Sequence, residues 1–454
     1  MEQFITQDAI FQVPELEKML ILQYIKGYFR TCQERSPVMK ISNLTLGRYD
    51  FAAYASFTGY ALCSLAIPIV IVSMAKDLDF PLADGGMAQG GALHLVRSIA
   101  MIVTLLLCGP IAGRFGNRLT LGTGMLFMGI GVLCCALSPV YWLLLPLLAI
   151  AGLGEGICEG VATPFVQNLH PDQPERYVNI AHSFWSVGIL VCVLLAGGLI
   201  TLGYDWRIVL GGCGVLALLA SLLVCWKETP GKEYPERKEK VNLKEVWQQT
   251  VKIHKTPRYW VYCAGMFMGA GSEFCLTFWA AAYLELNFAA TTFVAGLGTG
   301  AIAAGMFLGR TVFGYFASKD ALPKILLACG LGTIPLSLAL VFLKPDLFPN
   351  TALMYATVFV LLFLCGIGIA PYWPTLQVHG VNNMPELDST LLYIYFSAWG
   401  IPGCGFFTWI FGVVGDYYKS PCAAVVLIPV SLVVFSLIVF CEHWVFKNKR
   451  KLAE

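Results

Sequence analysis

Two carboxylates lie in the middle of an apolar segment that is long enough to cross a lipid bilayer. Glu155 and Glu159 fall near the centre of residues 142–166, where an acidic side chain costs roughly 2.5–3.5 kcal/mol on insertion scales. Their i, i+4 spacing places both on one face of a helix. Acidic residues persist at such depth where they bind a solute, line a wet cavity or carry a proton. We therefore predict that Glu155 and Glu159 take part in proton coupling.

Other polar residues inside apolar segments are candidates for solute binding. His94 and Arg97 share a helical face at i, i+3 spacing, and arginine keeps its charge in proteins. Arg97 therefore either pairs with Glu155 or Glu273 and holds the structure together, or binds an acidic group of the solute. His182 is either a structural histidine or a solute contact, and Glu273 is a second candidate for binding solute hydroxyls. We predict substrate-binding roles for all four, namely His94, Arg97, His182 and Glu273.

Three tryptophans could add flat ring surfaces to such a site. Trp279, Trp373 and Trp399 fall in apolar segments of the second half of the chain. Aromatic faces pack well against the C–H surface of a solute, although each ring alone could equally be lipid-facing or part of the core. We predict that these tryptophans include solute contacts.

The elements that position these residues are membrane-spanning helices. The chain is 57% hydrophobic and only 13% charged, whereas soluble domains carry about 25% charged residues. Since a bilayer admits only helices or closed barrels, we predict an all-α membrane protein. The twelve predicted spans are 50–74, 86–112, 118–138, 141–169, 176–202, 207–226, 259–285, 289–317, 321–343, 351–377, 388–414 and 421–446.

The distribution of lysine and arginine predicts the orientation. With a cytoplasmic N-terminus, the inner segments hold 24 of these residues and the outer segments hold four, Lys76, Arg207, Lys344 and Lys419. Cytoplasmic loops carry such an excess. We therefore predict that both termini are cytoplasmic, in an inner or plasma membrane. Because orientation explains the basic residues, nothing indicates a nucleic-acid partner.

The spans fall into two groups of six. We predict a cytoplasmic segment at 1–47, in which residues 14–35 have the pattern of an amphipathic helix on the membrane surface. A six-helix bundle at 48–227 precedes a polar linker at 228–257, with a short helix expected near Leu243–His254. A second bundle at 258–446 precedes a cytoplasmic tail at 447–454.

Loop motifs between the spans resemble those of the major facilitator superfamily. The sequences GPIAGRFGNR at 109–118 and GYFASK at 314–319 occupy equivalent places in the two halves and are similar to the superfamily's Gly-xxx-Asp-Arg-x-Gly-x-Arg-Arg loop. Both lack its aspartate. Gly412-xxx-Asp416 and Asp205-Trp206-Arg207 also look like superfamily marks. The resemblance implies two six-helix bundles with a solute site between them and gating roles for Arg114, Arg310 and Asp416.

A narrower resemblance links the chain to the fucose permease-like sugar–proton symporters. It rests mainly on GICEGVATPFV at 156–166 and NIAHSFWSVG at 179–188. It implies that Glu159 is the proton-coupling glutamate and that His182 takes the place of a glutamine at the sugar site. Thr163 replaces an asparagine of the motif. Ser64 stands where fucose permease has an acidic residue, so the two-carboxylate scheme of fucose transport does not transfer whole.

These features predict a secondary transporter that takes up a sugar or sugar derivative together with protons by alternating access. A sugar acid is the alternative solute that Arg97, His94 and His182 suggest. An organic-anion or metabolite transporter and a drug or metabolite exporter are the competing functions. No enzyme, cofactor or metal motif is present in the sequence. The expected partners are a small solute, protons and membrane lipid, and the expected state is a monomer.

Overall fold

The computed structural model describes residues 46–172, 174–226, 230–231, 233–236, 243–316 and 319–451. For residues 174–176, 179, 243, 314–316 and 444–451 it describes the backbone alone. The amphipathic helix predicted at 14–35 lies outside this range, and so do residues 452–454 of the tail predicted at 447–454.

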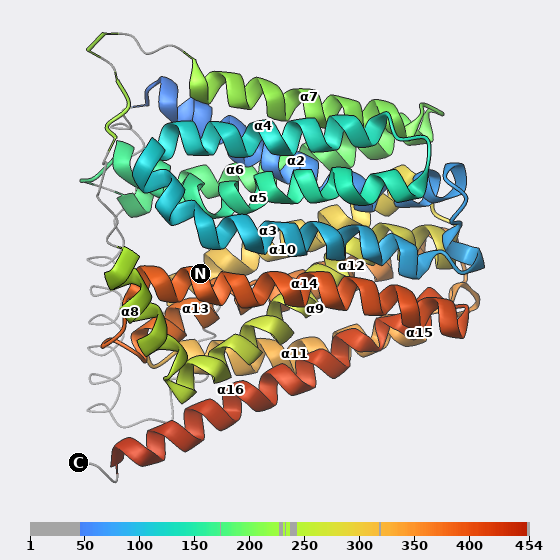
Figure 1. Cartoon of the computed structure of the whole chain (residues 1–454). Helices are drawn as coiled ribbons and strands as arrows, with labels where there is room; N and C mark the ends of the chain where they lie inside the picture. Colours follow the sequence, from blue (N-terminus) through green and yellow to red (C-terminus); the bar gives the residue numbers. More distant parts are fainter. Residues whose placement is uncertain are drawn as a thin grey trace, which may run out of the picture. The chain divides into compact units, whose positions relative to one another are not determined.

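Long helices follow one another through this part of the chain, with no strand among the described residues. In the first half the helices are α2 (Arg48–Asp77), α3 (Met87–Phe115), α4 (Asn117–Ala136), α5 (Tyr141–Leu169), α6 (Pro174–Thr201) and α7 (Trp206–Cys225). They run alongside one another, as Figure 1 shows. The turn between α3 and α4 is a single residue, Gly116, whose φ of 89° favours glycine.

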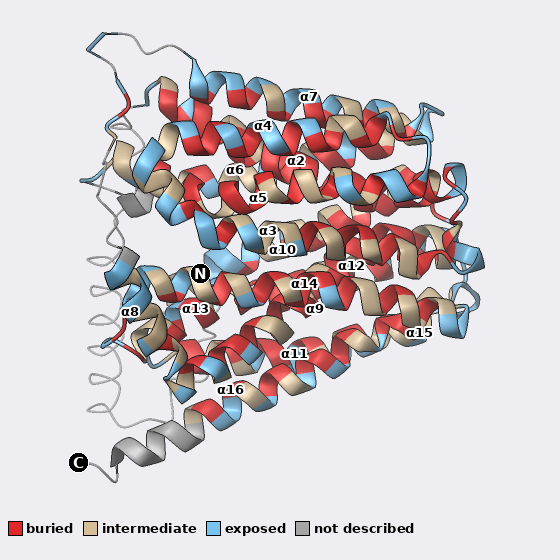
Figure 2. Ribbon diagram, viewed as in Figure 1, coloured by how far each residue is buried: buried red, intermediate tan, exposed pale blue. Residues whose placement is uncertain are grey.

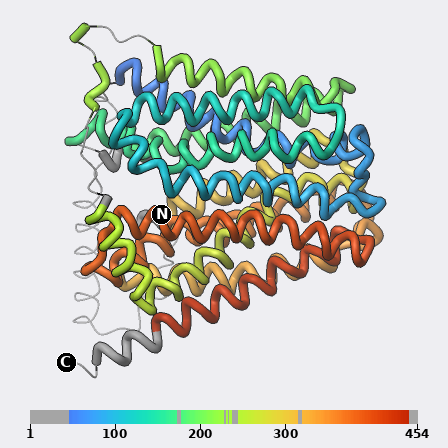
Figure 3. Tube along the Cα trace, in the orientation of Figure 1, coloured from blue at the N-terminus to red at the C-terminus, as the bar shows by residue number. Residues whose placement is uncertain are grey.

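The second half repeats this arrangement with α9 (Pro257–Phe288), α10 (Thr292–Phe316), α11 (Leu322–Phe342), α12 (Thr351–Ile369), α13 (Tyr372–Asn382), α14 (Ser389–Tyr418), α15 (Pro421–Val425) and α16 (Leu427–Lys451). The predicted span 351–377 is interrupted at Ala370 and Pro371, where α12 ends and α13 begins. Figure 3 shows the successive crossings of the chain.

Eleven helical segments within the described residues are long and apolar enough to cross a membrane. Helix α9 is not among them, and its 32 residues include Arg258, Glu273 and Glu285. It packs against α14, α16 and α10 inside the second half. With α9, the helices match the twelve spans predicted from the sequence. Figure 2 shows buried residues along the faces that the helices turn toward one another.

Different connecting segments lie at the two ends of the helical assembly. One end, here called the α8 end, holds the start of α2, the linker residues Tyr234 and Glu236, and the short helix α8 (Leu243–His254), at the bounds expected for a linker helix. The opposite end, here called the α15 end, holds α15 and the turn η3 (Leu82–Asp84). Figure 1 places α8 and α15 at opposite ends of the helices.

The linker is attached to both halves at the α8 end. The Tyr234 hydroxyl donates to the Phe165 carbonyl (2.9 Å), and the Glu236 carboxylate accepts from the backbone N–H groups of Asn117 and Arg118 (2.9 and 3.1 Å). These contacts satisfy donors at the start of α4. On the other half, Thr250 of α8 hydrogen-bonds to Tyr395 of α14 (2.6 Å).

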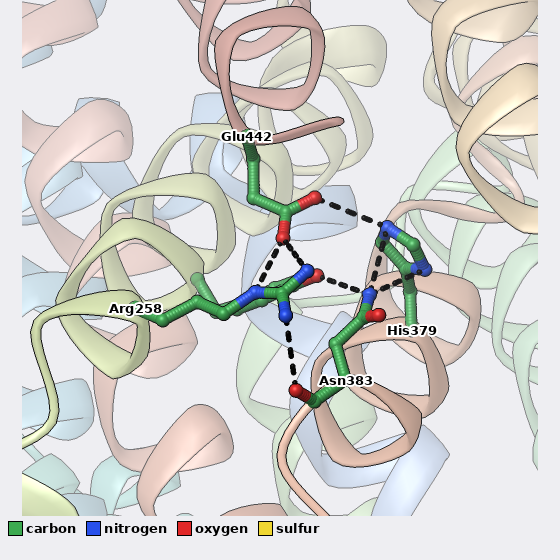
Figure 4. Close-up of polar contacts among 5 residues, drawn as sticks. Arg258, His379, Asn383 and Glu442 are labelled. Atoms are coloured by element: carbon green, nitrogen blue, oxygen red, sulfur yellow. Dashed lines mark hydrogen bonds and ion pairs between the residues drawn. The ribbon is translucent and has the colours of Figure 1, made fainter. Parts of the chain in front are cut away.

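A charged cluster joins three helices of the second half near the same end. Arg258 of α9 binds Glu442 of α16 through Nε and Nη2 (2.7 and 2.5 Å), and His379 of α13 reaches the second carboxylate oxygen (3.3 Å). Arg258 also donates to the Asn383 carbonyl (3.1 Å), and the Asn383 amide donates to the Tyr262 hydroxyl. Figure 4 shows these groups converging. Because both carboxylate oxygens of Glu442 are bonded, the cluster ties α13 to α9 and α16.

The two halves meet mainly along two helix pairs, α3 with α14 and α6 with α10, with a smaller contact between α2 and α9. Glycines allow the backbones to approach closely. A Cβ added to Gly91 of α3 would lie 2.5 Å from the Thr408 carbonyl, and one added to Gly405 of α14 would lie 2.9 Å from the Ser98 Cβ. These contacts fall in the part of each helix that leads toward the α15 end.

Candidate functional site

Arg97 and Glu155 form a buried ion pair within the first half. The Arg97 Nε lies 2.9 Å from Glu155 Oε2, and each side chain is 2% exposed. Arg97 Nη2 also donates to the hydroxyl and the carbonyl of Ser64 on α2 (2.9 and 3.2 Å), while the Ser64 hydroxyl donates to Glu155 Oε1 (3.4 Å). Three helices, α2, α3 and α5, are therefore joined by one network.

In this network Arg97 has the pairing that the sequence offered as one of its two roles. Its charge is neutralised by Glu155, and solvent does not reach the guanidinium group in this conformation. An arginine so placed cannot bind an acidic group of a solute without first leaving its partner. The pairing role is the one that the geometry supports.

Arg310 and Glu273 form a second ion pair within the other half. Arg310 Nη2 lies 3.1 Å from Glu273 Oε1. Arg310 Nε donates to the Ala370 carbonyl at the interruption between α12 and α13 (3.4 Å). The Arg310 side chain is 40% exposed, and Glu273 is 12% exposed. Arg310 thus contacts the place where the tenth predicted span is divided into α12 and α13, and it stays accessible to solvent.

Glu159 is the remaining carboxylate of this region, and its environment differs from that of the other two. It accepts a hydrogen bond from the Tyr60 hydroxyl of α2 (3.4 Å). Among the described residues no lysine, arginine or histidine forms an ion pair with it. Arg310 of the other half lies within electrostatic range. Glu159 is therefore a half-buried acid without a fixed counter-ion.

His182 of α6 faces solvent on the same side of the first half. Its Nε2 lies 2.9 Å from the Thr163 hydroxyl of α5, and its ring packs against Phe57 at 4.6 Å between centroids. The side chain is exposed and lies within electrostatic range of Arg310. Glu159 and His182 of one half thus lie within electrostatic range of Arg310, which pairs with Glu273 in the other half.

His94 does not join this group. Its ring stacks on Phe274 (4.2 Å between centroids, 10° between planes), and its Nε2 lies 3.3 Å from the Ser98 hydroxyl. The side chain is 6% exposed. In this conformation α9 covers the ring, and the solute contact expected of His94 stays a prediction.

The three predicted tryptophans have different environments. Trp279 is 2% exposed, stacks on Phe411, and donates from its indole nitrogen to the Thr408 carbonyl (2.9 Å), so it belongs to the packing between α9 and α14. The assignment of Trp279 as a solute contact stays a prediction. Trp373 is half-buried, and Trp399 is 36% exposed with its ring edge to face against Trp260.

Truncation of Trp279 and truncation of Trp399 should therefore lower the stability of the protein to different extents. Trp279→Ala should destabilise the protein by about 3–5 kcal/mol because it leaves a cavity in a packed interface. Trp399→Ala should cost much less because part of the ring already faces outward. Thermal unfolding of both purified variants measures the difference, and equal losses would contradict the assignment of Trp279 to the core.

The residues predicted to gate transport are also separated. Arg114 is exposed at the end of α3, and its guanidinium carbon lies 5.4 Å from the ring centroid of Phe115. Arg310 belongs to the ion pair described above. Asp416 of α14 reaches across to the first half, where its two oxygens accept from the N–H groups of Met87 and Ala88 (2.9 and 2.8 Å).

Sequence reasoning missed one direct partner of the predicted site, Tyr60. Its ring lies edge to face on Trp185 (4.5 Å), and its hydroxyl reaches Glu159. Tyr60 and Ser64 are separated by four residues on α2, so one helical face carries both polar contacts to the glutamates of α5. That spacing was the available signal.

Comparison with known proteins identifies the class to which this arrangement belongs. The sequence profile of the Major Facilitator Superfamily matches residues 52–407. The chain belongs to the Major Facilitator Superfamily, whose members are multi-pass membrane transporters.

Solved structures of several transporters share the fold. The nucleoside transporter NupG aligns with a TM-score of 0.68 at 14% identity, over 87% of this chain and 100% of that protein. The D-xylose–proton symporter aligns with a TM-score of 0.66 at 15% identity, over 86% and 96%. The Escherichia coli fucose:proton symporter FucP aligns with a TM-score of 0.58 at 17% identity, over 87% and 98%. The last two fit the resemblance to sugar symporters.

Curated relatives match a shorter part of the chain. Multidrug resistance protein MdtH of Shigella dysenteriae is 30% identical over 162 residues, which are 36% of this chain and 39% of that protein. Multidrug efflux pump SdrM of Staphylococcus aureus is 26% identical over 176 residues, or 37% and 38%. The matched stretch thus spans well under half the length of these relatives.

Proposed function

We propose that the protein takes up a neutral polar solute, such as a sugar, together with protons. The observation that carries the proposal is the unequal pairing of the three acids in the central region. Arg97 pairs with Glu155 and Arg310 pairs with Glu273, which leaves Glu159 without a cation. An acid with no permanent counter-ion can gain and lose a proton without breaking an ion pair, as a coupling site requires.

The charges of these five residues favour a neutral solute over a sugar acid. Three carboxylates face two guanidinium groups, so protonation of Glu159 brings the group to zero net charge. A solute with its own negative charge would add an uncompensated charge to a site of low dielectric constant. A sugar instead offers hydroxyl groups that can bind His182, Thr163 and the free donors of Arg310.

In this proposal Glu159 links protonation to the change of access. Loading with a proton and solute makes the site electrically neutral, and a neutral site can be enclosed between the halves at little desolvation cost. The two halves then exchange access around the site. We place the α8 end in the cytoplasm of an inner or plasma membrane, as the basic residues predict.

Export of a cationic compound is the second candidate. The similarity to proteins named for multidrug resistance and efflux favours it. The same unpaired Glu159 would then bind either a proton or a cation, with the two exchanging across the membrane.

Uptake into proteoliposomes separates these functions. With an imposed inward proton gradient, we expect accumulation of a neutral sugar, which a protonophore abolishes. Radiolabelled hexoses, pentoses, sugar acids and lipophilic cations should be compared in parallel with protein-free liposomes. Gradient-driven exchange of a lipophilic cation, without any response to sugars, would replace uptake by export. Accumulation of sugar acids alone would contradict the charge argument.

A further inference from the structure

The contacts that close the α15 end repeat in the two halves. Helix α14 ends near Asp416 and lies against the start of α3 in the first half. Helix α6 ends at Thr201 and lies against the start of α10 in the second half. Because α14 and α6 hold equivalent positions in their six-helix halves, as α3 and α10 do, the two interfaces correspond to one another.

Each interface contains a side chain that caps a helix of the other half. The carboxylate of Asp416 accepts from the Met87 and Ala88 N–H groups (2.9 and 2.8 Å). The hydroxyl of Thr201 accepts from the Phe293 N–H group (2.9 Å). The first N–H groups of a helix have no acceptor within the helix, and Gly86, which precedes α3, provides no side-chain cap.

A glycine stands one helical turn before each capping residue and lets the helices meet. Gly412 precedes Asp416 by four residues, and a Cβ there would lie 2.1 Å from the Met87 carbonyl oxygen. Gly197 precedes Thr201 by four residues, and a Cβ there would lie 3.1 Å from the Cα of Phe293. Both halves therefore use the pattern Gly-xxx-capping residue at the same place.

We propose that Asp416 and Thr201 form a pair of reciprocal helix caps that holds the transporter closed at the α15 end. Each half supplies one cap and receives the other. When the halves separate at this end, the hydrogen bonds of both caps break together, and the freed backbone N–H groups bind water instead. Asp416 is the stronger member because a carboxylate makes two charge-assisted bonds and interacts favourably with the helix dipole. The inference needs no assumption about the solute.

The cavity beside Asp416 is consistent with a contact between the halves that can break and re-form. A cavity of about 190 Å³ adjoins it and is lined from both halves, by Leu82 and Gly85 on one side and Asn287 and Lys419 on the other. Water can therefore reach the groups that lose their partners, which lowers the cost of separation. A cap sealed within the core would lack this route.

Hydrogen exchange of the purified full-length protein tests the proposal without any ligand. In Asp416→Ala, amide exchange should become about two- to thirtyfold faster, the loss expected for a helix cap, in peptides covering residues 82–92 and also in those covering 288–297. Thr201→Val should accelerate both regions to a smaller extent. Thr201→Ser, which keeps the hydroxyl, should leave both regions unchanged.

Faster exchange in both regions after mutation of a single cap would distinguish a gate from two independent local caps. Asp346→Asn removes an exposed carboxylate at the same end, in the turn Pro345–Leu347, and serves as the matched control with no expected change. Acceleration confined to the mutated cap, or absent from both regions, would overturn the proposal. If Asp416→Ala does not fold, Asp416→Leu and Thr201→Val provide the same comparison, since both remove the hydrogen-bond acceptor and nearly keep the side-chain size.

Discussion

Replacing Glu159 with glutamine should abolish proton-driven accumulation of the transported sugar while leaving sugar exchange in place. Glutamine keeps the size of the side chain and can still accept from Tyr60, which lies 3.4 Å from the carboxylate, but it cannot take up or release a proton. In the proposed cycle the empty carrier returns only after Glu159 has lost its proton. Exchange of internal for external sugar omits that step.

The measurement compares net uptake under a proton gradient with counterflow in the same proteoliposomes. We expect uptake to fall to the level of protein-free liposomes and counterflow to remain. Glu245→Gln on the exposed face of α8 serves as the control for removal of a glutamate. Retained gradient-driven accumulation in Glu159→Gln would remove this residue from the coupling mechanism, and loss of both activities would assign it to solute binding instead.

Breaking the buried pair Arg97–Glu155 should strongly destabilise the protein. Replacement of Arg97 by methionine leaves the Glu155 carboxylate, which is 2% exposed, without its cation. Removal of one partner of a buried ion pair costs about 3–5 kcal/mol, whereas replacement of both partners by apolar residues is often close to neutral. We therefore expect the double variant Arg97→Met, Glu155→Met to be more stable than Arg97→Met alone.

Thermal unfolding of the two variants in the same detergent provides the test. Arg207→Gln is the matched control, because Arg207 pairs with Asp77 in a much more exposed setting, where its side chain is 32% exposed, and such pairs contribute about 0–1 kcal/mol. If Arg97→Met unfolds at the wild-type temperature, the pair has no structural role and the hypothesis of an acidic solute bound to Arg97 regains its support.

The similarity to sugar symporters is one of fold, whereas the similarity to efflux proteins is one of sequence over part of the chain. Structural likeness over 86–87% of the chain is at 14–17% identity and shows the fold. The sequence similarity to MdtH covers only 36% of the chain. Neither similarity shows how Glu155, Glu159 and Glu273 are paired in this chain. The choice between uptake and export therefore rests on the chemistry of these side chains.

Several features followed from local sequence signals. Apolar length alone predicts the helices, because a backbone in lipid must satisfy its own hydrogen bonds, and the observed bounds of α5 and α8 coincide with the predicted segments 141–169 and 243–254. The importance of Glu155 and Glu159 also follows from local sequence, since an acid in an apolar segment is costly wherever the helix packs.

The partner of each charge depended on contacts between residues far apart in the chain. The sequence left Arg97 a choice between Glu155, Glu273 and a solute, and only the packing of α3 against α5 brings its guanidinium group to Glu155. Likewise, no local pattern separates Trp279 from Trp399, although one lies in the core and the other is partly exposed. Burial of a ring depends on which neighbouring helix covers it.

The sequence by itself thus determined that this chain crosses the membrane as helices and carries acids within them. The tertiary structure decided that Glu159 is the acid without a cation and that Thr201 caps a helix of the opposite half. The physical reason is the separation along the chain of the residues that interact. Membrane insertion and helix formation depend on neighbours within a few turns, whereas ion pairs and caps between helices depend on how separate segments are placed in space.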